Sequence, residues 1–563
     1  MIGIKAWKKP NHRPQTKAMR QENFLVVSPL QMDTEKASME RPMAINNNSM
    51  KVISNDLWRK NSIFCPFIDK KHIFATIKTH SKMKKTLLLM LALLLAVGCF
   101  AQDEQTPKKP KKAKKEKIYN EKGEIIKQGW NFGPLPVVGY DADLGFQYGL
   151  CCDIFNFGDG SRYPRYNYKF NVEASRYTKG SGVFRFYSDL PYVVKDTKLF
   201  FDLTYFYANK YEFFGFNGYQ SSTYDPVVEQ AHLINPDTLD KKIKSGYHFI
   251  DRNQLRFVGS MQRSFFGVPH LNWSAGLGYF YTTTSPIDTV KMHNYVNQPP
   301  TLFENFVNSG VIKQEEAKGG HTGQLRLGMI YDSRDHNSDP TRGIYAEGTL
   351  VGAFNIDNDK QYPIKDRTNY NLSFTFLWRH FIPLYKDKLT LAYRLGAQNR
   401  LAGHTPWYMI NNLNTMFFQK MYTEGLGGSV TMRGVNRNGV LGEGFAFANV
   451  ELRWRIVGFK FINQNWQVGI NPFFDAGIVT QKYREKEMIE AENEYESSLE
   501  PSPDQKINKV YYSGDKESVH MSAGGGIKLI MNRNLIVSVD LGTALDKRDG
   551  KGLKTFVGFN YIF

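Results

Sequence analysis

Cysteine is scarce in this sequence. Its 563 residues include four cysteines: Cys65 and Cys99 stand alone, and Cys151 and Cys152 are neighbours. Neighbouring side chains in an extended segment point to opposite faces. The sequence therefore predicts neither a disulfide framework nor a cysteine-based metal cluster.

Long apolar runs are scarce as well. The run from Leu87 to Val97 is too short to cross a bilayer as a helix, and a mean hydropathy of -0.45 excludes a helical membrane protein. Aromatic residues are plentiful, at 14% of the chain, with 31 Tyr and 40 Phe. A polar average with many aromatic side chains is typical of a β-barrel whose strands face lipid on one side only.

Motifs of the common enzyme classes are missing too. The sequence has no His-Glu-x-x-His, no Gly-x-Ser-x-Gly and no phosphate-binding loop. The glycine cluster at 425–428 lacks the strand-to-helix setting of a nucleotide site. A hydrolase built on a barrel is the remaining enzymatic alternative, but we expect no enzyme, no cofactor and no metal ion.

The net charge of +19 at pH 7 would by itself suggest a nucleic-acid partner. Most of the excess lies in residues 1–128, however, and residues 129–563 are nearly neutral. Nucleic acid is therefore not an expected partner.

A secretory signal peptide is expected at residues 83–101. Lysines at 84 and 85 precede the apolar run, and Cys99-Phe100-Ala101 precedes the polar Gln102, where the mature protein should begin. A lipoprotein-type cleavage with lipidation of Cys99 is the alternative.

The flanking segments are expected to lack a fold of their own. Residues 1–82 are interpreted as a start codon called too far upstream or as a disordered leader. Residues 102–129 are expected to form a periplasmic linker, because 108–117 holds seven lysines and one glutamate and such charge runs are solvated.

From Trp130 onward the chain alternates apolar and polar residues with a period of two. Tyr370, Leu372 and Phe374, for example, share one face, and Asn371 and Ser373 the other. This is the periodicity of β-strands. About sixteen strands are expected, over residues 132–141, 143–154, 165–177, 181–190, 197–216, 246–262, 269–284, 320–334, 342–354, 368–380, 388–402, 443–457, 465–480, 518–531, 534–545 and 553–563.

The connections between these segments are sorted by length. Numbered along the chain, the long gaps are all odd; they lie near 217–245, 285–319, 355–367, 403–442 and 481–517, the last with a charged helical pattern near 484–497. A strand meander that crosses a membrane places all odd gaps on one side. The sequence therefore predicts an all-β fold over 130–563: a transmembrane antiparallel β-barrel of about 16 strands with long extracellular loops.

The alternation also assigns residues to the two faces of the late strands. Asn449, Glu451, Arg453 and Asp475 are expected to face the lumen. In the last segment, 553–563, the lipid-facing set includes Phe559, Tyr561 and Phe563. Such an aromatic end resembles the signal by which outer-membrane barrels are recognised for assembly; the alternative is an aromatic girdle at the membrane interface.

Three segments resemble the surface-antigen family of outer-membrane barrels, which includes BamA and TamA. Residues 331–343 resemble the turn between the eighth and ninth strands of that family, and 473–477 resemble its thirteenth strand. Met432-Arg433-Gly434-Val435 resembles a Val-Arg-Gly-Phe/Tyr motif in the sixth outer loop, with departures at Met432 and Val435. The turn motif comprises Asp332, Arg334, Asp335, Pro340, Arg342 and Gly343.

The resemblance implies a clasp inside the barrel. The family pattern places the loop arginine, here Arg433, against carboxylates of the lumen wall, for which Glu451 and Asp475 are the candidates. A guanidinium can bind carboxylates bidentately there, and Gly434 lets the backbone turn beside the wall. An ordinary solvated loop arginine is the alternative.

Two features bear on function in opposite directions. Gly133, Pro134, Pro136 and Gly139 weaken pairing of the first strand, which suits the lateral opening proposed for the family, although they also suit an entry turn. Against this, 102–129 is too short for the family's periplasmic POTRA modules.

The expected function is therefore assistance in protein insertion or translocation at the outer membrane of a Gram-negative cell. The expected partners are outer-membrane lipid, the assembly machinery and client barrel proteins. A transport or structural barrel without assembly activity is the alternative.

Overall fold

The computed structural model describes residues 118–119, 125–163, 165–229, 245–288, 300–359, 369–416, 425–461, 464–499, 508–533, 535–559, 561 and 563. The expected leader (1–82) and signal peptide (83–101) lie outside these residues, as does most of the expected linker.

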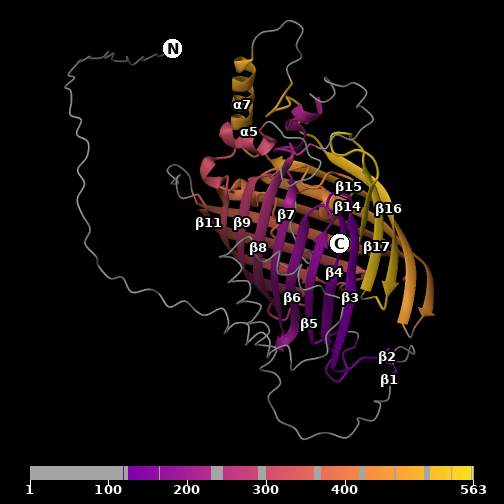
Figure 1. Cartoon of the computed structure of the whole chain (residues 1–563). Helices are drawn as coiled ribbons and strands as arrows, with labels where there is room; N and C mark the ends of the chain where they lie inside the picture. Colours follow the sequence, from indigo (N-terminus) through magenta and orange to yellow (C-terminus); the bar gives the residue numbers. More distant parts are fainter. Residues whose placement is uncertain are drawn as a thin grey trace, which may run out of the picture. The chain divides into compact units, whose positions relative to one another are not determined.

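Sixteen strands of the described chain form one closed barrel (Figure 1). Each strand pairs antiparallel with the next along the chain, and the last, β18, also pairs with the first, β3. The strands are β3 (Trp130–Asp141), β4 (Gly145–Asn156), β5 (Tyr168–Tyr177), β6 (Ser181–Val194), β7 (Thr197–Glu212), β8 (Phe249–Ser264), β9 (Leu271–Pro286), β10 (Gly319–Asp332), β11 (Gly343–Asp357), β12 (Tyr370–Tyr385), β13 (Leu389–Gly403), β14 (Gly444–Phe461), β15 (Gln464–Gln481), β16 (His520–Met531), β17 (Leu535–Ala544) and β18 (Lys554–Phe559). The predicted barrel and its strand number are confirmed.

The wall of the barrel is apolar outside and polar inside. On β12, Tyr370, Leu372 and Phe374 are exposed on the outer face, whereas Asn371 and Ser373 are buried inside. This alternation lets the strands face lipid while polar groups line the lumen. Among the described residues, no helix is both long and apolar enough to cross a membrane.

The final strand is shorter than its sequence pattern predicts. β18 ends at Phe559, and Tyr561 and Phe563 are only 5% and 9% exposed. The prediction that these two aromatic residues face lipid is therefore wrong. They lie inside the barrel because Arg453, on the inner face of β14, binds both rings.

Part of the expected linker is ordered. Ile118–Tyr119 (β1) and Ile125–Ile126 (β2) pair antiparallel as a separate two-stranded sheet. The first of these strands directly follows the lysine-rich run at 108–117.

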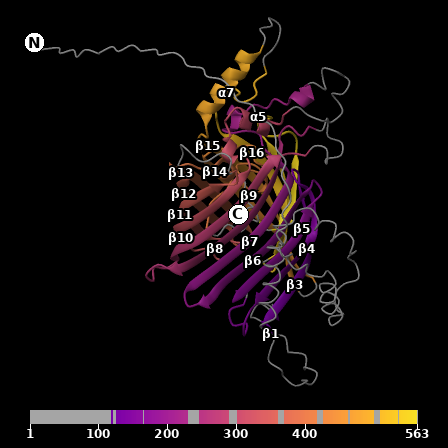
Figure 2. The same ribbon diagram turned by 60° about the vertical axis from the view of Figure 1, so that its left-hand side comes forward.

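The long loops meet at one end of the barrel and form an apolar cap. Helix α5 (Leu302–Asn308) and helix α7 (Glu485–Ser498) lie above the strands in both views (Figures 1 and 2). The cap joins side chains from four loops. Each loop contributes one of the residues Phe213, Phe306, Trp407 and Tyr483, together with others. The charged helical pattern predicted near 484–497 thus corresponds to α7.

The described residues of the loop between β13 and β14, 404–416 and 425–443, include a set of apolar side chains that pack inside the barrel. They form a second buried cluster with the inner wall; the loop's members are Leu413, Met416, Leu426, Val430, Met432, Val435 and Val440. This loop is therefore a plug and not a freely solvated outer loop.

Candidate functional site in the barrel lumen

A short helix brings the plug against the inner wall. Helix α6 spans Gly428–Thr431. Arg394 on β13 donates to the main-chain oxygen of Val430 at 2.8 Å, and Asn449 on β14 donates to that of Thr431 at 2.7 Å. These two bonds satisfy carbonyl groups at the end of α6 and position the residues that follow it.

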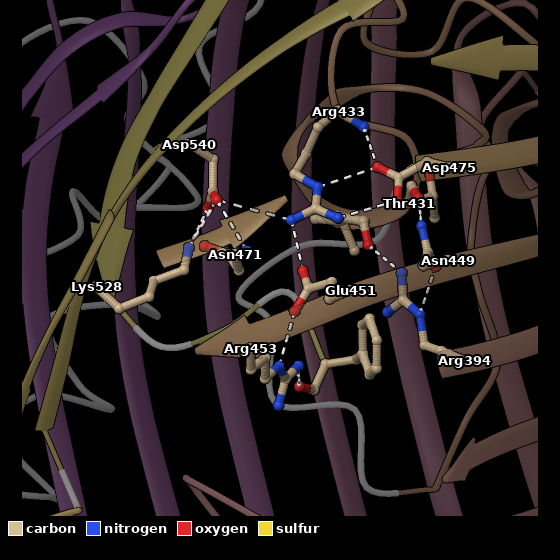
Figure 3. Close-up of polar contacts among 12 residues, drawn as sticks. Arg394, Thr431, Arg433, Asn449, Glu451, Arg453, Asn471, Asp475, Lys528 and Asp540 are labelled. Carbon is tan, nitrogen blue, oxygen red and sulfur yellow. Dashed lines mark hydrogen bonds and ion pairs between the residues drawn. The ribbon is translucent and has the colours of Figure 1, made fainter. Parts of the chain in front are cut away.

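Arg433 lies at the centre of the site (Figure 3). Its Nε and Nη2 each donate to one oxygen of Asp475 at 3.0 Å, and its main-chain N–H donates to the same carboxylate at 3.0 Å. Its Nη1 donates to Glu451 Oε1 at 2.6 Å. The guanidinium also lies over the Phe473 ring, 3.4 Å from its centroid. The structure thus brings the loop arginine onto both carboxylates that the sequence proposed for it.

Two further ion pairs complete what we call the lumen cluster. Glu451 accepts a second bond, from Arg453 at 2.8 Å, and Asp540 accepts from Lys528 at 2.6 Å while lying 3.7 Å from Arg433. With Asp475, the cluster holds three cations and three carboxylates, none with a side chain more than 9% exposed. Charges buried to this extent are stable only when paired and hydrogen-bonded, as these are.

The residues beside Arg433 fit closely. Gly434 has a φ of +102°, and a Cβ there would lie 2.6 Å from the backbone of Thr543 on β17, so glycine is required. Met432 and Val435, where the chain departs from the family motif, are fully buried. A Cβ at Gly477 would meet the Met432 sulfur, so the methionine occupies the space that this glycine leaves.

Asp540 and Lys528 were not predicted as members of the cluster. A signal was available, because Val539 and Leu541 alternate outward on β17 and leave Asp540 on the inner face. No motif marks these two residues, and only the barrel closure brings β16 and β17 beside the plug.

The turn motif lies at the end of the barrel opposite the cap, between β10 and β11. Arg334 donates to both oxygens of Asp332 at 2.8 Å. Gly343 has a φ of +100°, and a Cβ there would clash with the main-chain oxygen of Ser333. Pro340 is buried. The motif residues therefore fix the shape of a turn.

Asp335 caps this turn. Its carboxylate accepts the main-chain N–H groups of Thr341 at 2.8 Å and Arg342 at 3.2 Å, the Thr341 hydroxyl at 2.7 Å, and Arg533 at 3.0 Å. Partial burial raises the pKa of the Asp335 carboxyl, but these hydrogen bonds outweigh it and lower the pKa to about 2. The Arg342 side chain is exposed, 3.9 Å from Asp387.

Tyr561 and Phe563 occupy the lumen below the cluster. The Arg453 guanidinium lies 3.8 Å from the Tyr561 ring centroid and 4.8 Å from that of Phe563, and it donates to the Phe563 main-chain oxygen at 2.8 Å. Tyr561 also packs against Ile530 and Ile536. Of the three predicted assembly-signal residues, only Phe559 remains on a strand.

The seam between β3 and β18 is the weakest join of the barrel. Two opposed pairs close it, Asp141 with Phe556 and Tyr140 with Val557. By comparison, β17 and β18 share six pairs, and β3 and β4 share twelve. Among the described residues, 130–139 therefore have no strand partner on the seam side.

Two prolines shape the free edge of β3. Pro134 and Pro136 are two residues apart, so their nitrogens point to the same edge of the strand. The ladder with β4 is unbroken at both positions, which places those nitrogens on the seam side. At these two positions the free edge offers carbonyl acceptors but no N–H donors.

Comparison with known proteins identifies the family of the barrel. Residues 166–560, more than half of the chain, match the Omp85 superfamily domain. No curated protein sequence matches the chain.

Solved structures with a similar fold share little sequence with the chain. BamA from Haemophilus ducreyi lacking POTRA domains 1–3 has 16% identity and a TM-score of 0.42, over 77% of this chain and 70% of that one. CdiB from Escherichia coli has 11% identity and a TM-score of 0.41, over 77% of this chain and 63% of that one. CdiB from Acinetobacter baumannii has 12% identity and a TM-score of 0.38, over 78% of this chain and 60% of that one. The chain thus spans less than two thirds of either CdiB.

Proposed function

The chain belongs to the Omp85 superfamily, and from this premise we propose that it assists the insertion or translocation of proteins at the outer membrane. A barrel of this superfamily lies in that membrane. We propose further that it is exported through a cleavable signal peptide at 83–101 and acts without catalytic chemistry. Its proposed partners are outer-membrane lipid, client barrel proteins and the assembly machinery.

The observation that carries the proposal is the seam. Two residue pairs hold β3 to β18, so opening there breaks fewer hydrogen bonds than opening between any other neighbouring strands of the described barrel. An unpaired strand edge is also a template for another extended chain. The free edge of β3 supports contact with a client strand at this point.

The filled lumen supports a lateral route over an axial one. The plug, the lumen cluster and the cap occupy the interior with buried side chains. A client passing along the axis would have to displace paired charges, at high cost. A client at the seam would have to separate two residue pairs only.

A disulfide across the seam tests this proposal. Tyr140→Cys with Val557→Cys places cysteines on opposed residues of β3 and β18, in a chain whose Cys151 and Cys152 are replaced by serine. Cells that depend on the oxidised variant should lose outer-membrane proteins from their membrane profile, as depleted cells should, and reductant should restore them.

The matched control is Leu541→Cys with Thr555→Cys, an opposed pair between β17 and β18. This disulfide should leave the profile unchanged. A depleted strain with a normal outer-membrane protein profile would contradict the assembly role and leave a transport or structural barrel as the better description.

A further inference from the structure

The hairpin of β14 and β15 runs past its neighbour at the end of the barrel opposite the cap. The last residue of β14 that pairs with β13 is Trp454, and a bond from the Arg455 N–H to the Lys388 oxygen is the final main-chain contact on that side. β14 nevertheless continues to Phe461, still paired with β15. Among the described residues, 456–461 therefore have no strand partner on the β13 side, and we call them the β14 extension.

The outer face of the β14 extension continues the apolar surface of the barrel wall. Val457 and Phe459 pair with Val468 and Trp466, which lie on the same side of β15 as the lipid-facing Phe474. Val457 is 51% exposed and Phe459 is 45% exposed. The extension thus carries an apolar face beyond the point where the adjoining strand β13 ends.

The other face of the β14 extension is polar and positively charged. Lys460 pairs with Asn465, on the lumen-facing side of β15. Its side chain is exposed and forms no ion pair with any residue that the structure describes. The turn between β12 and β13, which adjoins the start of the extension, exposes Lys386 and Lys388 against one acidic residue, Asp387. The surroundings of the edge are therefore net positive.

The free edge of the β14 extension has main-chain groups to satisfy. Every second residue of a strand directs its N–H and C=O groups to a given edge, so about three residues of 456–461 offer theirs on the β13 side. No proline interrupts these donors. β12 also runs past β11, at 382–385, but that shorter run contains Pro383. Because hydrocarbon cannot satisfy such groups, the edge of the β14 extension must face water or pair with another chain.

We propose that the β14 extension is a docking edge for an extended segment of another protein in which apolar residues alternate with acidic ones. The segment adds as a strand on the β13 side, and its main chain pairs with the free edge. Its apolar side chains join Val457 and Phe459, and its acidic side chains approach Lys460. This inference does not depend on the assembly role proposed above, and the seam between β3 and β18 takes no part in it.

The charge of the docking edge favours this partner over two others. A second copy of the chain would bring Lys460 and the turn lysines of two molecules together, and like charges opposed across a sheet repel. Lipid could cover Val457 and Phe459, but it could not pair with the main-chain groups. A lysine on an exposed edge discourages unspecific strand pairing, whereas a carboxylate opposite it makes the same lysine an attractive contact.

A short synthetic peptide of alternating valine and glutamate tests the docking edge, with the full-length barrel in nanodiscs of phosphatidylcholine. Fluorescence anisotropy should show that the labelled peptide binds, and that the matched peptide of valine and lysine binds at least about tenfold more weakly, because like charges are then brought together. The fully N-methylated valine–glutamate peptide keeps the side chains but has no N–H groups, and it should not bind. Hydrogen exchange at 456–461 should slow when the unmodified peptide is added.

Variants of Lys460 separate the docking edge from unspecific binding. Lys460→Glu should weaken binding of the valine–glutamate peptide by at least about tenfold and favour the valine–lysine peptide, whereas Lys460→Arg should keep the preference of the parent. The matched control is Lys195→Glu, which changes an exposed lysine in the turn between β6 and β7 and should bind as the parent does. Unchanged binding by Lys460→Glu, equal binding of the N-methylated peptide, or protection of 130–139 in place of 456–461 would each overturn the proposal. So would dimers of the barrel that protect 456–461 without peptide.

Discussion

The environment of Arg433 decides what the lumen cluster contributes to stability. Its guanidinium is 1% exposed and shares its donors between Asp475 and Glu451. Removing one member of such a buried cluster costs more than the pair itself stabilises, because the remaining charge stays buried without its partner.

We expect Arg433→Ala to lower the temperature at which the barrel unfolds on a heat-modifiability gel. The cost is up to about 3–5 kcal/mol, reduced by any water that enters the lumen. Asp475→Ala should add little to Arg433→Ala, because the two residues act as one unit.

The pair Arg548 and Asp546 serves as a surface comparison, 2.7 Å apart with side chains 41% and 35% exposed. Breaking it should cost no more than about 1 kcal/mol. Additive effects of Arg433→Ala and Asp475→Ala would show that the two residues are not coupled.

Single residues of the cluster were predictable where a local pattern and a motif agreed. Alternation placed Glu451 and Asp475 on the inner face, and the family motif supplied Arg433. The second role of Arg453 was not predictable, because its partner Phe563 lies 110 residues away and only the closed barrel brings them together.

At the scale of elements, the β10–β11 turn depends on one carboxylate with a lowered pKa. The Asp335 pKa falls from 3.8 to about 2 in the folded protein, so its contribution to stability is complete above pH 3.8 and is lost as the pH falls toward 2. The gap in unfolding temperature between the parent and Asp335→Asn should therefore be constant above about pH 5 and shrink below pH 4. A gap that is independent of pH down to 2 would show that the Asp335 charge does not hold the turn.

The element that the sequence described least well is β18. A period-two pattern continues to Phe563 whether the chain stays in the sheet or bends inward, so the pattern cannot locate the strand end. The bend depends on tertiary contacts with β14, β16 and β17, and these override the local pattern. The strands from β4 to β17 have neighbours on both sides, and their predicted ends agree within a few residues.

For the whole molecule, the sorting of long and short connections predicts which ends of the strands face outward. Cysteines placed in 217–245, 285–319 and 481–517 should react with an impermeant reagent on intact cells, and a cysteine in 458–464 should not. Glu490 on α7 is a suitable position for a cysteine that should react, and Gln464 at the start of β15 is one for a cysteine that should not. Equal labelling of both classes would reject the topology.

The apolar cap also matters for the cell that carries this barrel. A barrel of sixteen strands is wide enough to leave an aqueous channel, as porins of that size do, and such a channel would admit small solutes. Here rings from four loops, including Phe213, Phe306 and Tyr483, pack together at the loop end of the barrel. The protein can therefore be present in many copies while the outer membrane remains a permeability barrier, and single barrels in a planar bilayer should carry far less current than a porin.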